Sequence, residues 1–533
     1  MNHIIKHTMK VFQFLLISMF SLTIFAQQPT QNLAKKTPLT EQQLQRWSHL
    51  DLEKDTIPGM SVDKAYTELL KNKKGVKVIV AVVDSGVDID HEDLKSVIWT
   101  NKKEIPNNGK DDDKNGYVDD IHGWNFLGDS NNENLEMVRI LKKGDDGSET
   151  YKNVLADYTQ RFKEASQAKE AVDALLNAEK TISEFLKSDN YTIEELKNMP
   201  SVEPQLLDSK RIMLSYATFR GATFHDDLKS YKTSVYDQLD YNLNKDFDGR
   251  KLVGDNPDDI TNKNYGNNVV YSKDRKDSLH GTHVAGIIAQ VRNNNLGGDG
   301  VADNVEIMPV RAVPNGDEYD KDIALAIRYA VDNGAKVING SFGKDYSPHA
   351  GWVYDAIKYA ASKDVLIVHA AGNDSKDIDT EPNFPTDEVN GAEISDNLIT
   401  VGALRNEIGE KVVAKFSNYG KKNVDVFAPG VKIYAAVPNN KYKYLQGTSM
   451  ASPNTAGVAA LIRSYYPNLK ASQVKQILIQ SGTPLSFDVK VGAKQEKIPF
   501  SETCVSGRIV NAYNALKMAE KISKKTHKKH PKL

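Results

Sequence analysis

Uninterrupted runs of valine and isoleucine constrain the fold of this chain more than any other feature. The run "KVIVAVVDSG" begins at Lys77, and similar runs recur at 335–343, 365–373, 398–404 and 424–430. Apolar runs without alternation are typical of strands that are buried on both faces. Amphipathic segments, such as 320–335 and 352–364, lie between several of these runs. Strands that alternate with helices predict an α/β fold, with a mostly parallel sheet and helices on both faces.

Residues 129–245 interrupt this alternation. They are highly charged, contain no comparable strand run and show helical spacing of apolar residues: Ala165, Ala168, Val172, Leu175, Ile182 and Leu186. This spacing predicts one apolar helix face, and Thr192 followed by Glu195 predicts a capping box at the start of another helix. We therefore expect a helical insertion at 129–245, within an α/β domain made of 61–128 and 246–517.

The first 26 residues have the features of an export signal. Lys6 and Lys10 precede the apolar run "VFQFLLISMFSLTIFA", and Ala26 is a small residue suited to cleavage. No second apolar stretch of membrane-spanning length follows. We expect a signal peptide at 1–26, no membrane span after its removal, and an exported protein that is secreted, periplasmic or on the cell surface. A retained membrane anchor is the alternative.

Composition narrows the remaining possibilities. The chain has 69 Lys and Arg against 71 Asp and Glu, so its net charge does not favour nucleic acid as a partner. Cys504 is the only cysteine, so an exported chain must be stabilised by something other than an internal disulfide, and a bound metal is a candidate. We expect 27–60 to be a short leader or linker, and 518–533 to be a basic, solvated tail.

Reactive side chains stand at the ends of the predicted strands and at the starts of two predicted helices. The first strand ends in Asp84, Asn373 follows the strand at 365–371, and His280 and Ser449 each begin a helix of small residues. In parallel sheets such groups gather at the carboxyl ends of the strands. An acid, a histidine and a serine are what nucleophilic acyl transfer needs. The Asn373 amide and the Ser449 backbone N–H are suited to stabilising an oxyanion.

Ser449 also has a simpler interpretation. Pro453 fits only the first turn of a helix, which places Ser449 at a helix N-terminus. A lone serine at that position is most often a helix cap. The other motifs have to distinguish a cap from a nucleophile.

Four motifs together resemble a known family. "VVDSGVD", "HGTHVAG", "AAGN" and "GTSMASP" resemble the signature blocks of the subtilisin-like serine proteases, in the Asp, His, Ser order of that family. The resemblance covers roughly 75–125 and 247–480. It implies a subtilisin-like three-layer sandwich and a serine endopeptidase that works through an acyl-enzyme. Protein or peptide substrates and no cofactor for catalysis are implied as well.

The resemblance also implies roles for individual residues. Asp84 would be the orienting acid, His280 the general base, Ser449 the nucleophile and Asn373 the oxyanion donor. His283 would be structural. The implied substrate-binding strand and specificity pocket comprise Ser341, Phe342, Gly343, Ala371 and Gly372. Filling of the core is the alternative role for Phe342.

The chain departs from compact members of the family between Asp84 and His280, where the helical block adds length. This arrangement looks like that of larger bacterial members, including a Bacteroidetes-type group. Three roles remain open for the helices: to shade the substrate groove, to dock a partner or to stabilise the fold.

Two segments are candidates for structural calcium. Oxygen-bearing residues with the spacing of an EF-hand-like loop occur at Asp111, Asp113, Asn115 and Asp119. Position twelve of that loop is His122 rather than glutamate, and an acidic turn without metal is the alternative.

The second candidate is Asp93, which matches the position of a calcium ligand in the family. Asn293 and Asn295 are its possible companions.

Two further functional hypotheses compete with an active protease. One is a scaffold that keeps the fold without the chemistry, and the other is a calcium-dependent surface protein. The presence of all four catalytic residue types favours the protease.

Overall fold

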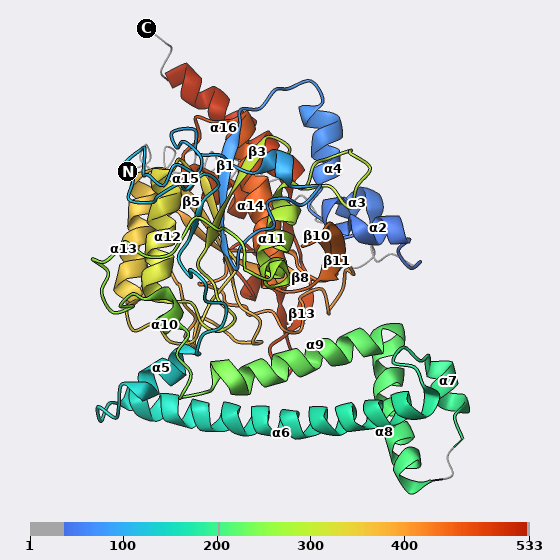
Figure 1. Ribbon diagram of the computed structural model, residues 1–533. Coiled ribbons are helices and arrows are strands. Elements are labelled where there is room, and N and C mark those ends of the chain that lie inside the picture. Colours follow the sequence, from blue (N-terminus) through green and yellow to red (C-terminus); the bar gives the residue numbers. More distant parts are fainter. Residues whose placement is uncertain (1–36, 201–202, 530–533) are drawn as a thin grey trace, which may run out of the picture.

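The computed structural model describes residues 37–200 and 203–529, and a nine-stranded sheet forms its centre (Figure 1). The strand order is β12-β15-β9-β8-β5-β4-β1-β3-β2, and every pairing is parallel except that of β12 with β15. The strands are β1 (Val78–Asp84), β2 (Trp124–Asn125), β3 (Val305–Arg311), β4 (Val337–Gly340), β5 (Leu366–Ala370), β8 (Leu398–Leu404), β9 (Val426–Pro429), β12 (Thr483–Pro484) and β15 (Arg508–Ile509). Each predicted valine and isoleucine run forms a strand of this sheet.

Both faces of the central strands are buried, as the uninterrupted runs predict. Along β1, Val80 and Val82 join one hydrophobic cluster, and Ala81 and Val83 join a second. The first cluster includes residues of α11 (Leu279–Ala289), α14 (Thr448–Tyr465), α15 (Ala471–Ser481) and α16 (Ala512–Lys529). The second includes residues of α12 (Asp320–Asp332) and α13 (Ala350–Ser362). The predicted three-layer α/β fold is confirmed.

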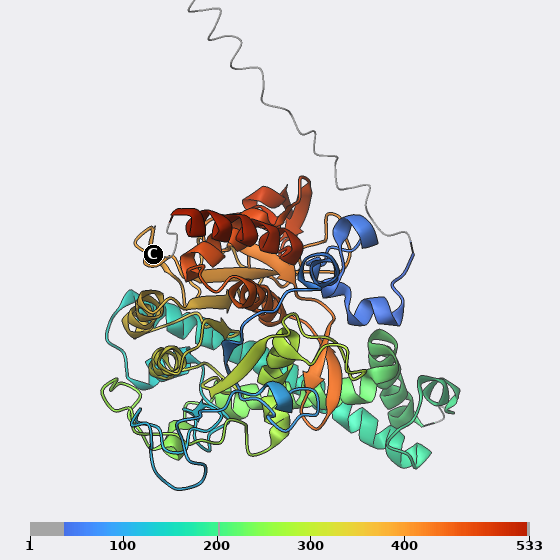
Figure 2. The same cartoon turned by 90° about the horizontal axis from the view of Figure 1, so that it is seen from above.

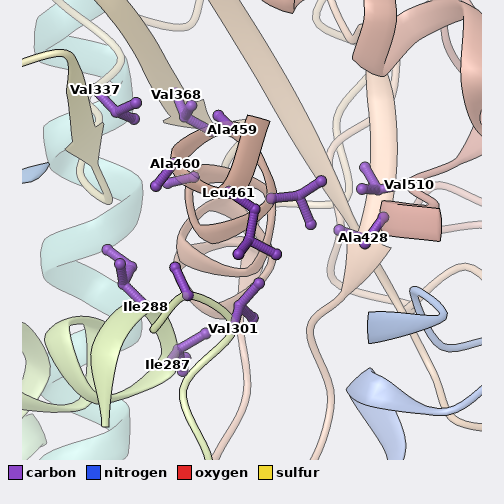
Figure 3. Packing of buried hydrophobic residues seen from close by; sticks show 14 of the residues in the cluster. Ile287, Ile288, Val301, Val337, Val368, Ala428, Ala459, Ala460, Leu461 and Val510 are labelled. Atoms are coloured by element: carbon purple, nitrogen blue, oxygen red, sulfur yellow. The ribbon is translucent and has the colours of Figure 1, made fainter. Parts of the chain in front are cut away.

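Helix α14 runs through the first cluster, where its small residues allow close packing. Ala459, Ala460 and Leu461 lie among side chains from α11, β4, β5 and β9 (Figure 3). A Cβ on Gly457 would lie 2.5 Å from the Cβ of Val301, closer than two carbon atoms approach. The run of small residues after Ser449 therefore seats this helix in the core.

The helical block forms a separate group of helices beside the sheet (Figure 1). Its helices are α5 (Glu136–Lys142), α6 (Glu149–Leu186), α7 (Ile193–Asn198), α8 (Pro204–Arg220), α9 (Phe224–Asp237) and the π-helical turn η6 (Gln238–Asn242). Ala165, Val172 and Ile182 of the predicted apolar face are buried. The predicted capping box at Thr192 and Glu195 is confirmed.

The segment that we expected to be a leader or linker, 27–60, folds against the core from Thr40 onward. It contains α2 (Glu41–Gln45), the short turn η2 (Trp47–His49) and α3 (Leu52–Asp55). The indole N–H of Trp47 donates to the carbonyls of Val431 and Lys432 at 3.0 and 3.1 Å, and Ile57 and Met60 are fully buried. A few apolar side chains in a polar stretch are enough to anchor it, because they join the main core.

The N-terminal and C-terminal segments of the described chain pack against each other near α4 (Val62–Ala65) and the start of α16. The blue N-terminal helices stand beside the red C-terminal helices in Figure 2, and the backbone N–H of Ala512 donates to the carbonyl of Met60 at 2.7 Å. The predicted tail, 518–533, begins inside α16, whose residues Leu516 and Ala519 are buried. The predicted signal peptide, 1–26, lies outside the described residues. Within the described ranges, no helix is both long enough and apolar enough to cross a membrane.

The remaining elements are short. They are α4 (Val62–Ala65), α10 (Arg250–Val253), the turns η3 (Tyr66–Leu70), η4 (Lys95–Val97), η5 (Gly221–Thr223), η7 (Arg275–Ser278) and η8 (Phe500–Glu502), and three hairpins, β6 (Glu388–Val389) with β7 (Ala392–Glu393), β10 (Ile433–Val437) with β11 (Lys441–Leu445), and β13 (Asp488–Val491) with β14 (Glu496–Pro499).

Candidate active site

Asp84 and His280 are joined at the carboxyl end of β1. Asp84 is 1% exposed, and its Oδ1 accepts hydrogen bonds from His280 Nδ1 and from the Ser85 N–H, both at 2.7 Å. A carboxylate only accepts, so Nδ1 of His280 carries the proton and Nε2 is the acceptor in the neutral ring. The acid thus selects the tautomer that a general base needs.

His280 stands in the first turn of α11, which packs closely against β1. A Cβ on Gly281 would lie 2.2 Å from the carbonyl oxygen of Gly86, so only glycine allows this approach. Burial on its own would lower the pKa of His280, but the charge of Asp84 and its hydrogen bond outweigh burial and raise that pKa. Nε2 has no hydrogen-bond partner among the residues that the structure describes, and the side chain is 37% exposed.

His283 has a structural role, as expected. It is fully buried, and its Nε2 lies 3.1 Å from the carbonyl of Ile433 and 3.0 Å from that of Lys443, on β10 and β11. Burial lowers its pKa to about 4. A neutral donor on this ring ties the β10–β11 hairpin to α11.

Ser449 is the second residue of α14, which begins at Thr448. Its hydroxyl donates a long hydrogen bond, 3.5 Å, to the carbonyl of Ser341. Within the described part of the chain, the Ser449 hydroxyl forms no hydrogen bond with His280. Ser341 lines the cavity at Ser449 and also the neighbouring cavity at His280, so the two catalytic candidates border a common residue.

The expectation that Pro453 lies in the first turn is wrong, because α14 begins one turn earlier. A proline at 453 has no N–H for the carbonyl of Ser449, four residues before it. The hydroxyl of Ser341 donates to that carbonyl instead, at 3.0 Å. The proline therefore frees a backbone oxygen that binds the helix to the loop after β4.

Asn373 follows β5 with its amide oriented by Thr448. Its Oδ1 accepts from the Thr448 N–H at 2.8 Å and from the Thr448 hydroxyl at 3.1 Å. A backbone N–H can only donate, which settles which end of the amide is oxygen. Nδ2 has no partner within the described chain, so two donors remain free at the cavity that Asn373 and Ser449 line.

A cavity of about 320 Å³ extends from Ser449 and Asn373 along the loop after β4. Ser341, Phe342 and Gly343 all line it, and the N–H and C=O of Gly343 have no hydrogen-bond partner among the described residues. Phe342 also packs on the second hydrophobic cluster, so its position is compatible with both of its predicted roles. This free backbone edge suits an extended peptide.

One predicted pocket residue is placed differently. Gly372 lines the cavity, but Ala371 is fully buried in a third hydrophobic cluster, and Ala370 lines the cavity in its place. The reason is the strand period of two, which turns neighbouring residues to opposite sides.

The helical block contributes to the walls of both cavities, which sequence reasoning did not find. Met137 and Arg161 line the cavity at Ser449, and Thr233, Asp237 and Tyr241 line the one at His280. No sequence motif marks these residues, because their positions depend on how α6 and α9 dock.

Three carboxylates meet in the acidic loop. Glu104, Asp111 and Asp113 have oxygens within 4.8 Å of one another. Glu104 is 6% exposed, and its Oε2 is buried without a hydrogen-bond partner among the described residues. An orphaned carboxylate oxygen beside two others fits the oxygen ligands that calcium prefers.

The other predicted loop ligands are engaged elsewhere. Asp119 accepts from the backbone N–H groups of Asn108 and Gly109, at 3.2 and 2.8 Å. Asn115 donates to Asp120 and accepts from the Tyr117 N–H. Asp111 and Asp113 of the expected set therefore lie in this cluster together with Glu104, and Asn115 and Asp119 lie outside it.

Asp93 is fully buried and already satisfied by donors. It accepts from the amides of Gln290 and Asn294, at 3.0 and 2.6 Å, and from the Val291 N–H at 3.2 Å. Asn294, rather than Asn293 or Asn295, contacts it. Burial raises the pKa of Asp93.

The chain is similar in sequence to several known proteins. A family model described as "Subtilase family" matches residues 75–497. The "Thermophilic serine proteinase" of Bacillus sp. (strain AK1) is 32% identical over 379 residues, which are 67% of this chain and 89% of that protein. "Subtilisin DY" of Bacillus licheniformis is 38% identical over 208 residues, 39% of this chain and 71% of that protein. The "Cell wall-associated protease" of Bacillus subtilis (strain 168) is 39% identical over 221 residues, 41% of this chain and 23% of that protein.

Proposed function

Because the chain belongs to the subtilase family of serine endopeptidases, we propose that it hydrolyses peptide bonds through an acyl-enzyme on Ser449. In this proposal His280 is the general base and Asp84 orients it. The observation that carries the proposal is the 2.7 Å hydrogen bond from His280 Nδ1 to Asp84, which leaves Nε2 as a proton acceptor at the cleft.

The proposed reaction proceeds in two halves. The Ser449 hydroxyl turns from the Ser341 carbonyl toward His280, as catalytic hydrogen bonds often tighten only once substrate is bound. Nε2 takes its proton while Oγ attacks the peptide carbonyl, and His280 then gives the proton to the leaving amine. A water molecule attacks the ester in the second half, with His280 again as base.

The oxyanion of each half is stabilised by the amide of Asn373 and the N–H of Ser449. The free donors on Asn373 Nδ2 support this role, because Thr448 holds the amide in place. The position of Ser449 in the first turn of α14 adds the favourable field of a helix N-terminus.

Substrates are proposed to be proteins or peptides that bind in extended form along Ser341, Phe342 and Gly343. The helical block borders the cavities at both Ser449 and His280. This position supports the proposal that only extended segments of a substrate enter the cleft. Shading of the groove is therefore the role that we propose for the block, as in a larger, Bacteroidetes-type member of the family.

Replacing Asn373 with alanine tests the proposed reaction. We expect kcat for a peptide substrate to fall roughly 10²- to 10³-fold, the size found for an oxyanion asparagine in subtilisin, with little change in KM. The exposed Asn177 on α6 offers a matched control, and Asn177→Ala is expected to leave kcat unchanged. A change confined to KM would show that Asn373 binds the ground state instead. Failure of the purified wild-type protein to cleave any peptide would reject the proposed function.

We propose that Glu104, Asp111 and Asp113 hold a structural calcium ion. Calcium that binds only the folded state stabilises it by about 2.7 kcal/mol at 100 times Kd. We expect added calcium to raise Tm relative to EDTA, and Asp113→Ala to abolish the rise. Asp119→Ala should keep it, because Asp119 lies outside the cluster of carboxylates formed by Glu104, Asp111 and Asp113. A calcium effect that survives Asp113→Ala would contradict this site.

Export is proposed from the N-terminal signal features at Lys6, Lys10 and Ala26. The name of the Bacillus subtilis relative, "Cell wall-associated protease", supports it. Fractionation of cells that produce the full chain checks this proposal, and protein found only in the cytoplasm would contradict it.

A further inference from the structure

Glu318 is a buried carboxylate at the substrate cavity whose side chain forms no ion pair with the described residues. It lies between β3 and α12, is 3% exposed, and lines both the cavity at Ser449 and an adjoining small cavity. Apart from its own backbone N–H, its side chain has no hydrogen-bond or ion-pair partner among the described residues. Burial raises the pKa of this carboxyl to about 7.

The cations of the cavity compensate Glu318 only in part, because they pair with other carboxylates. Burial raises the pKa of Glu318 more than the charge of Lys344 lowers it. Lys344 Nζ binds Glu136 at 2.7 Å and Asp320 at 2.9 Å, and it meets only the backbone carbonyl of Glu318. Arg161 forms its ion pair with Asp345, which also binds Lys376 Nζ at 2.5 Å. The cavity therefore has spare negative charge.

The balance of charges along the whole cavity points the same way. Its charged lining residues are two cations, Arg161 and Lys344, and four carboxylates, Asp317, Glu318, Asp345 and Asp374. A buried carboxylate without a partner costs free energy. A positively charged ligand would lower this free-energy cost by pairing with the carboxylate. An apolar ligand would raise it by excluding water.

The cavity lies on the acyl side of the scissile bond. A leaving amine must reach His280 for its proton, and His280 lines the neighbouring cavity, not this one. This cavity instead contains the oxyanion donor Asn373 and the free edge at Gly343. Apolar surface for the methylene stem of a long side chain comes from Met137, Val313 and Phe342.

We propose that Glu318 recognises a lysine or arginine side chain within the four substrate residues that precede the cleaved bond. This inference rests on the proposed function and names its substrate class. Glu318 accepts hydrogen bonds from the substrate cation, and the site prefers basic over neutral side chains of the same shape.

Paired peptides with arginine or citrulline test the proposal, because citrulline keeps the shape and removes the charge. We measure kcat/KM for internally quenched peptides that carry the pair at each of the four positions. The wild-type protein should prefer arginine roughly 10- to 100-fold at one position, the range for a hydrogen bond between charged groups. Equal rates at all four positions, with the peptides still cleaved, would overturn the inference and leave the proposed function intact.

Glu318→Gln should reduce the arginine preference to near unity while kcat/KM for the citrulline peptide is kept. The variant removes a buried charge that is compensated only in part, so its Tm should equal or exceed that of the wild type. Glu407→Gln makes the same chemical change at an exposed site outside this cavity and should keep the preference. An unchanged preference for arginine in Glu318→Gln would show that another carboxylate binds the substrate cation, and would overturn the inference. Should that variant not fold, the arginine and citrulline rates of the wild type decide the matter.

Discussion

Replacing Ser449 with alanine is expected to lower kcat for a peptide about 10⁶-fold, the size known for loss of the nucleophile in subtilisin. The physical reason is that no other group in the cavity offers an activated oxygen: the hydroxyl of Ser341 is engaged with the Ser449 carbonyl. Residual turnover should remain above that in water, because Asn373 can still stabilise an oxyanion.

His280→Ala should cause a loss of similar size, and the double variant should lose little more. Nucleophile and base act as one unit, so their effects do not add. Labelling with a fluorophosphonate provides a second measurement: the wild type should react and Ser449→Ala should not. Ser188→Ala changes an exposed serine in the helical block and should label normally. Losses that multiply in the double variant, or labelling that persists in Ser449→Ala, would place the nucleophile elsewhere.

Replacing Asp84 with asparagine is expected to lower kcat about 10⁴-fold while the fold is kept. An amide can donate to Nδ1 and stabilise the tautomer whose Nε2 carries the proton, which cannot act as a base. In the wild type, Oδ1 of Asp84 accepts hydrogen bonds from His280 Nδ1 and from the Ser85 N–H. The first of these bonds fixes the proton of His280 on Nδ1.

The pH profile of Asp84→Asn gives a second, signed test. A general base must be neutral, so activity is lost as pH falls through the pKa of His280. Asp84 raises that pKa, so the acid limb of kcat/KM in the wild type should lie at a higher pH than it would without Asp84. Without the charge, the acid limb should move to lower pH.

Asp237→Asn is the matched control for this shift. Asp237 lines the cavity at His280 but hydrogen-bonds Asn315 rather than the imidazole. The acid limb should therefore stay in place in this variant. An acid limb that moves equally in both variants would show that His280 senses the general charge of the cavity and not its bond to Asp84.

Much of the fold and of the catalytic centre could be predicted because the signals are local. Uninterrupted valine and isoleucine runs mark β1, β4, β5, β8 and β9, since a strand buried on both faces needs apolar residues at every position. The pair Thr192 and Glu195 caps a helix with its own neighbouring atoms. Asp84, His280, Asn373 and Ser449 are predicted from short motifs whose order along the chain is itself a signal, and the structure joins Asp84 and His280 by a hydrogen bond.

What depends on the docking of distant segments could not be predicted. Glu104 joins Asp111 and Asp113 because of where the loops lie. Among the described residues, Glu318 is left without an ion pair because Lys344 binds Glu136 and Asp320. Arg161 reaches the cavity only through the packing of α6 against the sheet domain. The sequence by itself determined the buried strands of the sheet and the four motifs that carry the candidate catalytic side chains. The tertiary structure alone decided which charges are compensated and which walls enclose the cleft, because both depend on distances between residues that are far apart in the chain.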